Sequence, residues 1–187
     1  MRLLLFSLAL ILAACQPAGS FRAVDITGAA YARELALTDH NGAKRSLADF
    51  RGKLTVVFFG FTQCPDVCPT TLSDMAEVRK RLGKQGDQVQ VLFVTIDPER
   101  DTQALLAQYV PAFDPSFVGL YGDAAQTAAV AKEFKVFYAK APGRTPNSYT
   151  MDHTAGSYVF DREGRVRLFV RHGSSVEDIE HDLRRLL

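Results

Sequence analysis

The 187-residue sequence has few cysteines, no internal repeat, no low-complexity block and, beyond its first residues, no long hydrophobic run. Its three cysteines, Cys15, Cys64 and Cys68, are too few for the disulfide framework that stabilises small secreted domains. An excess of charge of one sign is also absent, since 22 Lys and Arg residues stand against 21 Asp and Glu residues. This balance argues against a nucleic-acid-binding protein.

The N-terminus has the pattern of an export signal. Arg2 precedes an apolar run over residues 3–12, which is too short to span a bilayer comfortably as a mature helix. The run ends in Leu12-Ala13-Ala14-Cys15, which resembles the lipobox of bacterial lipoproteins, where the cysteine is diacylated and becomes the first residue. This resemblance implies a signal peptide over residues 1–14 and a lipid on Cys15; the alternative is an ordinary signal peptide with an incidental cysteine.

Two or more acyl chains give durable membrane attachment. We therefore expect the protein in the cell envelope, on the periplasmic or extracytoplasmic side, anchored to a membrane by its lipid. Residues 15–30 contain Pro17 and Gly19 and are interpreted as a membrane-proximal linker. Residues 31–187 are long enough for one domain with a complete core.

The order of hydrophobic segments predicts an α/β domain. Near-continuous apolar runs at residues 54–59 and 88–96 are typical of strands buried on both faces of a sheet. Helices are expected at 70–82, 102–109, 124–134 and 176–187, and further strands at 31–37, 117–121, 155–160 and 166–170. Residues 139–152 have no predicted element, and loops of that length are usually functional or disordered. This order is that of a thioredoxin-like fold, with a central mixed sheet flanked by helices.

The two remaining cysteines, Cys64 and Cys68, lie between the first buried strand and the following helix. Each precedes a proline, and proline disfavours the α conformation in the residue before it, so neither thiol is expected inside a regular helix. Pro69 is expected to begin the helix, because proline suits the first helical position. Thiolates are stabilised at the positive end of a helix, so the pair is interpreted as redox-active or metal-binding.

Three motifs together resemble the signature regions of the Sco/SenC family. They are Cys64-Pro65-Asp66-Val67-Cys68-Pro69, Asp97-Pro98-Glu99-Arg100-Asp101-Thr102, and Asp152-His153-Thr154 followed by Asp161-Arg162-Glu163-Gly164. The resemblance covers roughly residues 35–187, and Thr154 stands where serine is common in the family. It implies a thioredoxin-like copper-binding protein that helps to assemble the dinuclear copper centre of cytochrome c oxidase.

The residue types agree with a copper site formed by Cys64, Cys68 and His153. Thiolates are soft ligands that suit Cu(I), and imidazole is an acceptable third donor; Cu(II) is left open. In a thioredoxin-like arrangement, the chain before the strand that follows the long loop passes beside the cysteine turn. Redox thioredoxins have a cis-proline there, whereas this chain has His153. His40, His172 and His181 are expected at the surface.

Other polar and sulfur-containing side chains have less specific settings. Asp97 ends a buried strand and is interpreted either as an outer-shell carboxylate that orients His153 or a partner, or as a cap of the following turn. Met151 is a weaker auxiliary donor, and Met75 is expected in the core. Asp66 is expected to be exposed to a partner.

Three functions are compatible with these residues. The first is a monomeric copper metallochaperone that passes its ion to the copper-site subunit of cytochrome c oxidase, with a further copper carrier or thiol reductant as an additional partner. The second is a thiol-disulfide oxidoreductase that reduces a partner's cysteines. The third is a peroxidase or redox sensor, for which the sequence offers no distinct support. Whether the protein is an enzyme is therefore left open.

Overall fold

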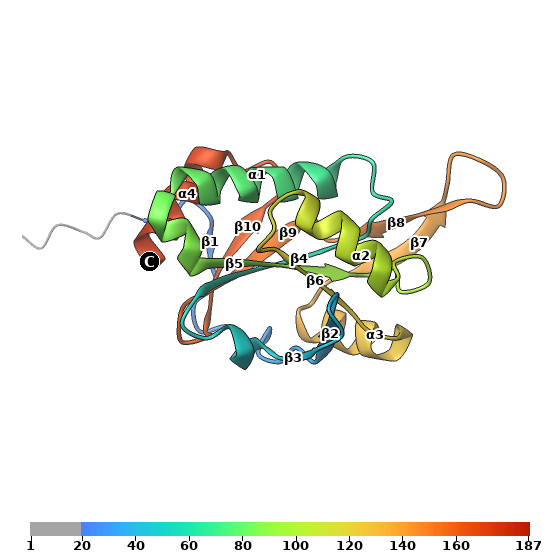
Figure 1. The fold of residues 1–187 in the computed structure, drawn as a ribbon, viewed down its shortest axis with the longest axis horizontal. Helices are drawn as coiled ribbons and strands as arrows, with labels where there is room; N and C mark the ends of the chain where they lie inside the picture. The colour runs from blue at the N-terminus through green and yellow to red at the C-terminus, as the bar shows by residue number, and fades with distance from the viewer. Residues whose placement is uncertain (1–19) are drawn as a thin grey trace, which may run out of the picture.

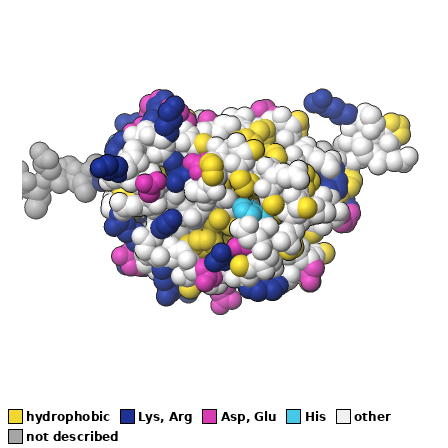
Figure 2. Space-filling view, in the orientation of Figure 1, with side chains coloured by type: hydrophobic (Ala, Val, Ile, Leu, Met, Phe, Trp, Pro, Cys, Tyr) yellow, Lys and Arg dark blue, Asp and Glu magenta, His cyan; other side chains and the backbone are white. Residues whose placement is uncertain are grey.

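The computed structural model describes residues 20–187, so the predicted signal peptide, Cys15 and the start of the linker lie outside the described residues. Eight strands form one mixed sheet in the order β1-β10-β9-β4-β5-β6-β2-β3, and β7 and β8 form a separate antiparallel pair. Helices α1, α2 and α4 cover one face of the large sheet and α3 lies on the other (Figure 1). Charged side chains of both signs gather at the end where the described chain begins (Figure 2).

The elements have the following bounds: β1 Val24–Asp25, β2 Leu37–Asp39, β3 Lys44–Arg45, η1 Leu47–Phe50, β4 Leu54–Gly60, α1 Val67–Arg81, η2 Gly83–Gln88, β5 Val89–Thr95, α2 Gln103–Tyr109, η3 Val110–Ala112, β6 Val118–Tyr121, α3 Ala124–Glu133, β7 Tyr138–Pro142, β8 Tyr149–His153, β9 Gly156–Phe160, β10 Val166–Arg171 and α4 Val176–Leu186.

The predicted central strands are confirmed. All residues of β4, β5 and β9 are buried, as expected for strands covered on both faces. β4 pairs with β5 in parallel and with β9 antiparallel, so the sheet is mixed. The core continues between the sheet and the helices through edge-to-face aromatic contacts such as Phe59 with Phe134 and Phe134 with Tyr158. Within residues 20–187, no helix combines the length and apolarity needed to cross a membrane.

Helix α1 begins earlier than predicted, and this changes the setting of one cysteine. It starts at Val67, so Cys68 lies in its first turn and only Cys64 lies in the preceding loop. The expectation that both thiols lie outside the helix is therefore wrong. The physical reason is that the first four N–H groups of a helix have no intrahelical partner, so Pro69 removes no hydrogen bond at this position. The first helical bond joins the Thr70 N–H to the Asp66 carbonyl.

The N-terminal part of the domain also differs from the prediction. The expected strand at 31–37 is wrong: the strand is β2, which pairs with β3 across the predicted turn at Asn41 and Gly42. Residues 20–30, assigned above to the linker, pack on the domain instead. β1 pairs with β10, and the main-chain N–H groups of Arg22 and Ala23 donate to the Asp182 carboxylate on α4.

The expectation that residues 139–152 form a loop with no helix or strand is wrong. They form most of the β7-β8 hairpin, in which Tyr138 lies opposite His153 and Pro142 opposite Tyr149. A turn over residues 143–148 closes it, with Asn147 at a positive φ of 65°. The sequence did not reveal the hairpin because most of its side chains are only partly buried, so no apolar alternation marks its strands.

Candidate metal centre

The structure brings Cys64, Cys68 and His153 together. One ligand atom from each residue lies within 4.8 Å of the others. Cys64 comes from the loop after β4, Cys68 from the first turn of α1 and His153 from the last position of β8. Cys68 is fully buried, while Cys64 and His153 are half-buried. Two sulfurs and one imidazole therefore converge at a site that is buried on the side of Cys68 and partly exposed on the side of Cys64 and His153.

The two thiols are free and differ in acidity. The pKa of Cys64 is lowered to about 4: a hydrogen bond with the Cys68 thiol lowers it most, burial opposes this, and His153 and main-chain N–H groups lower it further. One of these donors is the Cys68 N–H, 3.3 Å from the Cys64 sulfur at the N-terminus of α1. The same thiol pairing, together with burial, raises the pKa of Cys68. Cys64 is thus the thiolate and Cys68 its hydrogen-bond donor.

The imidazole of His153 is oriented by its own strand end. Its Nδ1 lies 3.0 Å from the Thr154 carbonyl; when Nδ1 carries the proton it donates to that carbonyl, and Nε2 is then available to bind a metal. Thr154 is held in turn by Phe137, whose N–H donates to the Thr154 hydroxyl and whose carbonyl accepts from the Thr154 N–H. The imidazole and the buried Phe61 ring pack edge to face, with an angle of 87° between their planes and their centroids 6.1 Å apart.

An open groove of about 400 Å³ is lined by Cys64 and His153, whereas the buried Cys68 does not line it. Pro65, Asp66 and Met151 also line this groove. Asp66 is exposed, as expected, and Met75 is in the core. Met151 is buried, and its role as an auxiliary donor stays a prediction. The groove leaves the half-buried Cys64 accessible to a partner.

The other histidines lie outside this groove. His172 is exposed, and His181 is half-buried beside Asp182. His40 is also half-buried, and its Nδ1 accepts the Gly119 N–H.

Gly60 is a site residue that the sequence analysis did not single out. A Cβ at this position would lie 2.8 Å from the Cys68 sulfur and 2.9 Å from the Phe93 ring, so only glycine lets the thiol pack against the end of β4. The signal was present in the sequence, because a glycine that ends an apolar strand often marks a close approach of another group.

Asp101 fixes the loop that leads to Cys64. Its buried carboxylate accepts hydrogen bonds from the N–H and hydroxyl of Thr62 at 3.0 and 2.6 Å, and from the Thr95 hydroxyl at 2.6 Å. Burial raises the pKa of Asp101, and the Thr62 and Thr95 donors oppose that rise. The carboxylate therefore ties the cysteine loop to the end of β5.

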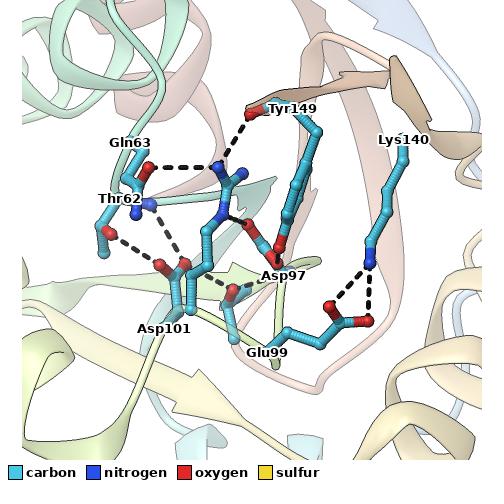
Figure 3. Close-up of polar contacts among 9 residues, drawn as sticks. Thr62, Gln63, Asp97, Glu99, Asp101, Lys140 and Tyr149 are labelled. Carbon is cyan, nitrogen blue, oxygen red and sulfur yellow. Dashed lines mark hydrogen bonds and ion pairs between the residues drawn. The ribbon is translucent and has the colours of Figure 1, made fainter. Parts of the chain in front are cut away.

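Among the described residues, no hydrogen bond joins Asp97 to His153. Its carbonyl accepts the N–H groups of Arg100 and Asp101, as a turn cap does. Its buried carboxylate binds the Arg100 guanidinium and accepts the Tyr149 hydroxyl at 2.9 Å (Figure 3). Burial contributes most to raising the pKa of Tyr149 to about 12, and the hydrogen bond to Asp97 contributes next, so this hydroxyl stays a donor.

Comparison with known proteins agrees with this geometry. The family model described as SCO1/SenC matches residues 24–187. The chain is 38% identical over 154 residues to the mitochondrial SCO2 homologue of Bos taurus, which covers 81% of this chain and 58% of that relative. The chain thus spans less than two thirds of the length of this relative.

Two solved structures are similar in fold and sequence. Bradyrhizobium japonicum ScoI with copper bound is 42% identical, covers 82% of this chain and 98% of its own, and has a TM-score of 0.74. Apo Sco1 from Thermus thermophilus is 36% identical, covers 92% and 100%, and has a TM-score of 0.80. These neighbours confirm the predicted thioredoxin-like fold. With a family model that matches nearly every described residue, the chain belongs to the SCO1/SenC family.

Proposed function

We propose that this protein is a copper metallochaperone that binds one copper ion through Cys64, Cys68 and His153 and passes it to an acceptor. The observation that carries this proposal is the convergence of the two sulfurs and the imidazole within 4.8 Å. Family relatives with copper bound, from Bradyrhizobium japonicum and Arabidopsis thaliana, support copper as the cargo.

The donor set fits Cu(I). Thiolate sulfur is a soft donor and imidazole a borderline one, a combination that favours copper over hard cations. With metal–sulfur bonds of about 2.3 Å, as for zinc, a trigonal site has its sulfurs roughly 4 Å apart. A separation of at most 4.8 Å between ligand atoms needs only a small closure to reach this geometry.

The Sco family takes part in cytochrome c oxidase assembly, and the acceptor we propose is the subunit that holds the dinuclear copper site of that oxidase. The groove beside Cys64 supports ligand exchange, because an incoming thiolate can reach the ion while Cys68 and His153 still hold it. The lipobox-like motif at residues 12–15 supports a lipid anchor on Cys15 outside the cytoplasm. We propose a monomer in that compartment.

The test is the Cu(I) affinity of the reduced protein, measured by competition with a chromophoric chelator. His153→Ala is expected to weaken binding strongly, whereas His172→Ala, at an exposed histidine outside the groove, is the matched control and is expected to bind like the parent. Parent-like affinity of the His153→Ala protein would show that the ligand set is wrong.

A second function is favoured by the accessible Cys64 thiolate, namely thiol-disulfide exchange with a partner. The Cys64 thiolate would attack a partner disulfide and release one partner thiolate. Cys68 would then attack the mixed disulfide, release the second partner thiol and leave a Cys64–Cys68 disulfide, so that two electrons pass to the partner. This activity should largely survive in His153→Ala, which separates it from copper binding.

A further inference from the structure

His153 reaches the cysteines from a separate two-stranded hairpin rather than from the main sheet. At the end of the hairpin next to the histidine, Thr154 and Phe137 bond its two legs to each other, and the chain continues into β9 of the main sheet. The position of the imidazole therefore also depends on what holds β8 at its other end, which is Tyr149.

Arg100 is the residue that holds Tyr149. Its guanidinium stacks on the Tyr149 ring at 3.6 Å from the centroid, and Nη1 donates to the Tyr149 carbonyl at 2.8 Å. The same Nη1 donates to the Gln63 side chain at 3.1 Å, one residue before Cys64 (Figure 3). One side chain thus contacts both the cysteine loop and the histidine hairpin.

Arg100 is itself held in place, so it can fix the positions of Gln63 and Tyr149. Its Nε bonds to Asp97, whose side chain is 2% exposed, and Tyr149 completes a triangle by donating to the same carboxylate. The guanidinium also lies over the Phe61 ring at 5.7 Å from its centroid, and the same ring contacts the His153 imidazole. The exposed Lys140–Glu99 ion pair beside Tyr149 adds little, since water and salt screen exposed ion pairs.

We propose that Arg100 and Tyr149 are positioning residues that set the distance between His153 and the two cysteines. This inference rests on the proposed three-ligand copper site. It assigns Asp97 a role that acts through Arg100 and Tyr149 rather than through the imidazole: the buried carboxylate orients the guanidinium, which fixes the hairpin.

The test uses two conservative variants. Tyr149→Phe keeps the stacked ring but removes the hydrogen bond to Asp97. Arg100→Lys keeps the charge but removes the guanidinium that donates to both Gln63 and the Tyr149 carbonyl. Each is expected to weaken Cu(I) binding by the reduced protein by roughly tenfold, at the lower end of the loss seen when groups supporting metal ligands are changed. Amide hydrogen exchange in residues 138–153 is expected to become faster in both.

A double-mutant cycle with His153→Ala shows whether the effect passes through the histidine. In the His153→Ala background, Tyr149→Phe is expected to cause no further loss of Cu(I) affinity. An equal loss in both backgrounds, or no loss in the parent background while His153→Ala binds weakly, overturns the positioning role alone. Parent-like affinity of His153→Ala overturns the ligand set and, with it, this proposal.

Arg79→Lys is the matched control for a general loss of stability. Arg79 is a comparably buried arginine that bonds to Asp114, Ser116 and the Gly86 carbonyl, away from the cysteines. It is expected to lower the unfolding temperature without changing Cu(I) affinity. A tenfold loss of affinity in Arg79→Lys would overturn the proposal, because any destabilised variant would then behave as Arg100→Lys does.

Discussion

The sulfur of Cys68 packs against Gly60 so closely that a Cβ at residue 60 would lie 2.8 Å from it. We expect Gly60→Ala to displace the thiol and to lower the free energy of unfolding by about 1–3 kcal/mol, the usual cost of overpacking a core. Because the displaced thiol is a proposed ligand, Cu(I) affinity should fall as well. Denaturant unfolding and chelator competition measure the two effects.

Gly119→Ala is the control for this substitution. Gly119 lies in β6, the strand that pairs in parallel with β5, away from the thiols. A Cβ at this position would lie 3.1 Å from a side-chain atom of Val110. It is expected to change stability without changing Cu(I) affinity. Wild-type copper binding by Gly60→Ala would contradict the view that glycine is needed for the position of Cys68.

The acidity of Cys64 predicts an unusual pH profile of thiol alkylation. Since its pKa is lowered to about 4, Cys64 is already a thiolate at neutral pH. The alkylation rate of the reduced protein by iodoacetamide should be nearly constant between about pH 6 and 8 and should fall only as the pH approaches the pKa, about 4. Peptide mass spectrometry assigns the modified cysteine. A rate that rises steadily up to about pH 8.5, as for an ordinary thiol, would contradict the prediction.

Copper is expected to order the hairpin. We predict that the β7-β8 residues exchange amide hydrogens faster in the apo protein than in the Cu(I)-loaded protein, because coordination by His153 adds an attachment of the hairpin to the cysteine loop and α1. Hydrogen exchange followed by mass spectrometry measures this, with β4 as an internal reference that should not change. Equal exchange of the hairpin in both forms would count against the prediction.

The N-terminal segment is expected to depend on Asp182. This buried carboxylate accepts the main-chain N–H groups of Arg22 and Ala23 at 3.0 and 2.7 Å. Asp182→Ala should lower the free energy of unfolding by about 1.5–3 kcal/mol, as for hydrogen bonds to a charged group, and should speed amide exchange in residues 21–25. Asp178→Ala removes an exposed ion pair with Arg22 but leaves both main-chain bonds to Asp182, so it should have a smaller effect. Slow exchange retained in Asp182→Ala would contradict this role.

The central sheet could be predicted because its strands are buried on both faces, and continuous apolar runs such as residues 54–59 indicate that arrangement without further information. The cysteine pair and His153 could be identified from their motifs and from chain order. The proximity of His153 to the thiols needed the fold, since the residues that lie together are far apart in sequence.

The attachment of the hairpin could not be predicted in the same way. Tyr149 and Arg100 are 49 residues apart, and neither belongs to an apolar period. Their contacts depend on the turn after β5, where Asp97 is buried and needs donors. A sequence pattern shows that a carboxylate follows a strand, but the three-dimensional structure alone shows which donors satisfy it.

Helix α1 also determines how far the thiols stand from the point where the chain enters the domain. It begins at the cysteines and ends at Arg81, whose carbonyl accepts Arg184 on α4, the helix that holds Arg22. Its 15 residues correspond to about 22 Å at about 1.5 Å per residue. With the proposed lipid on Cys15, the copper site would be tethered near the bilayer. Its search for an acceptor would then take place in a plane rather than in a volume.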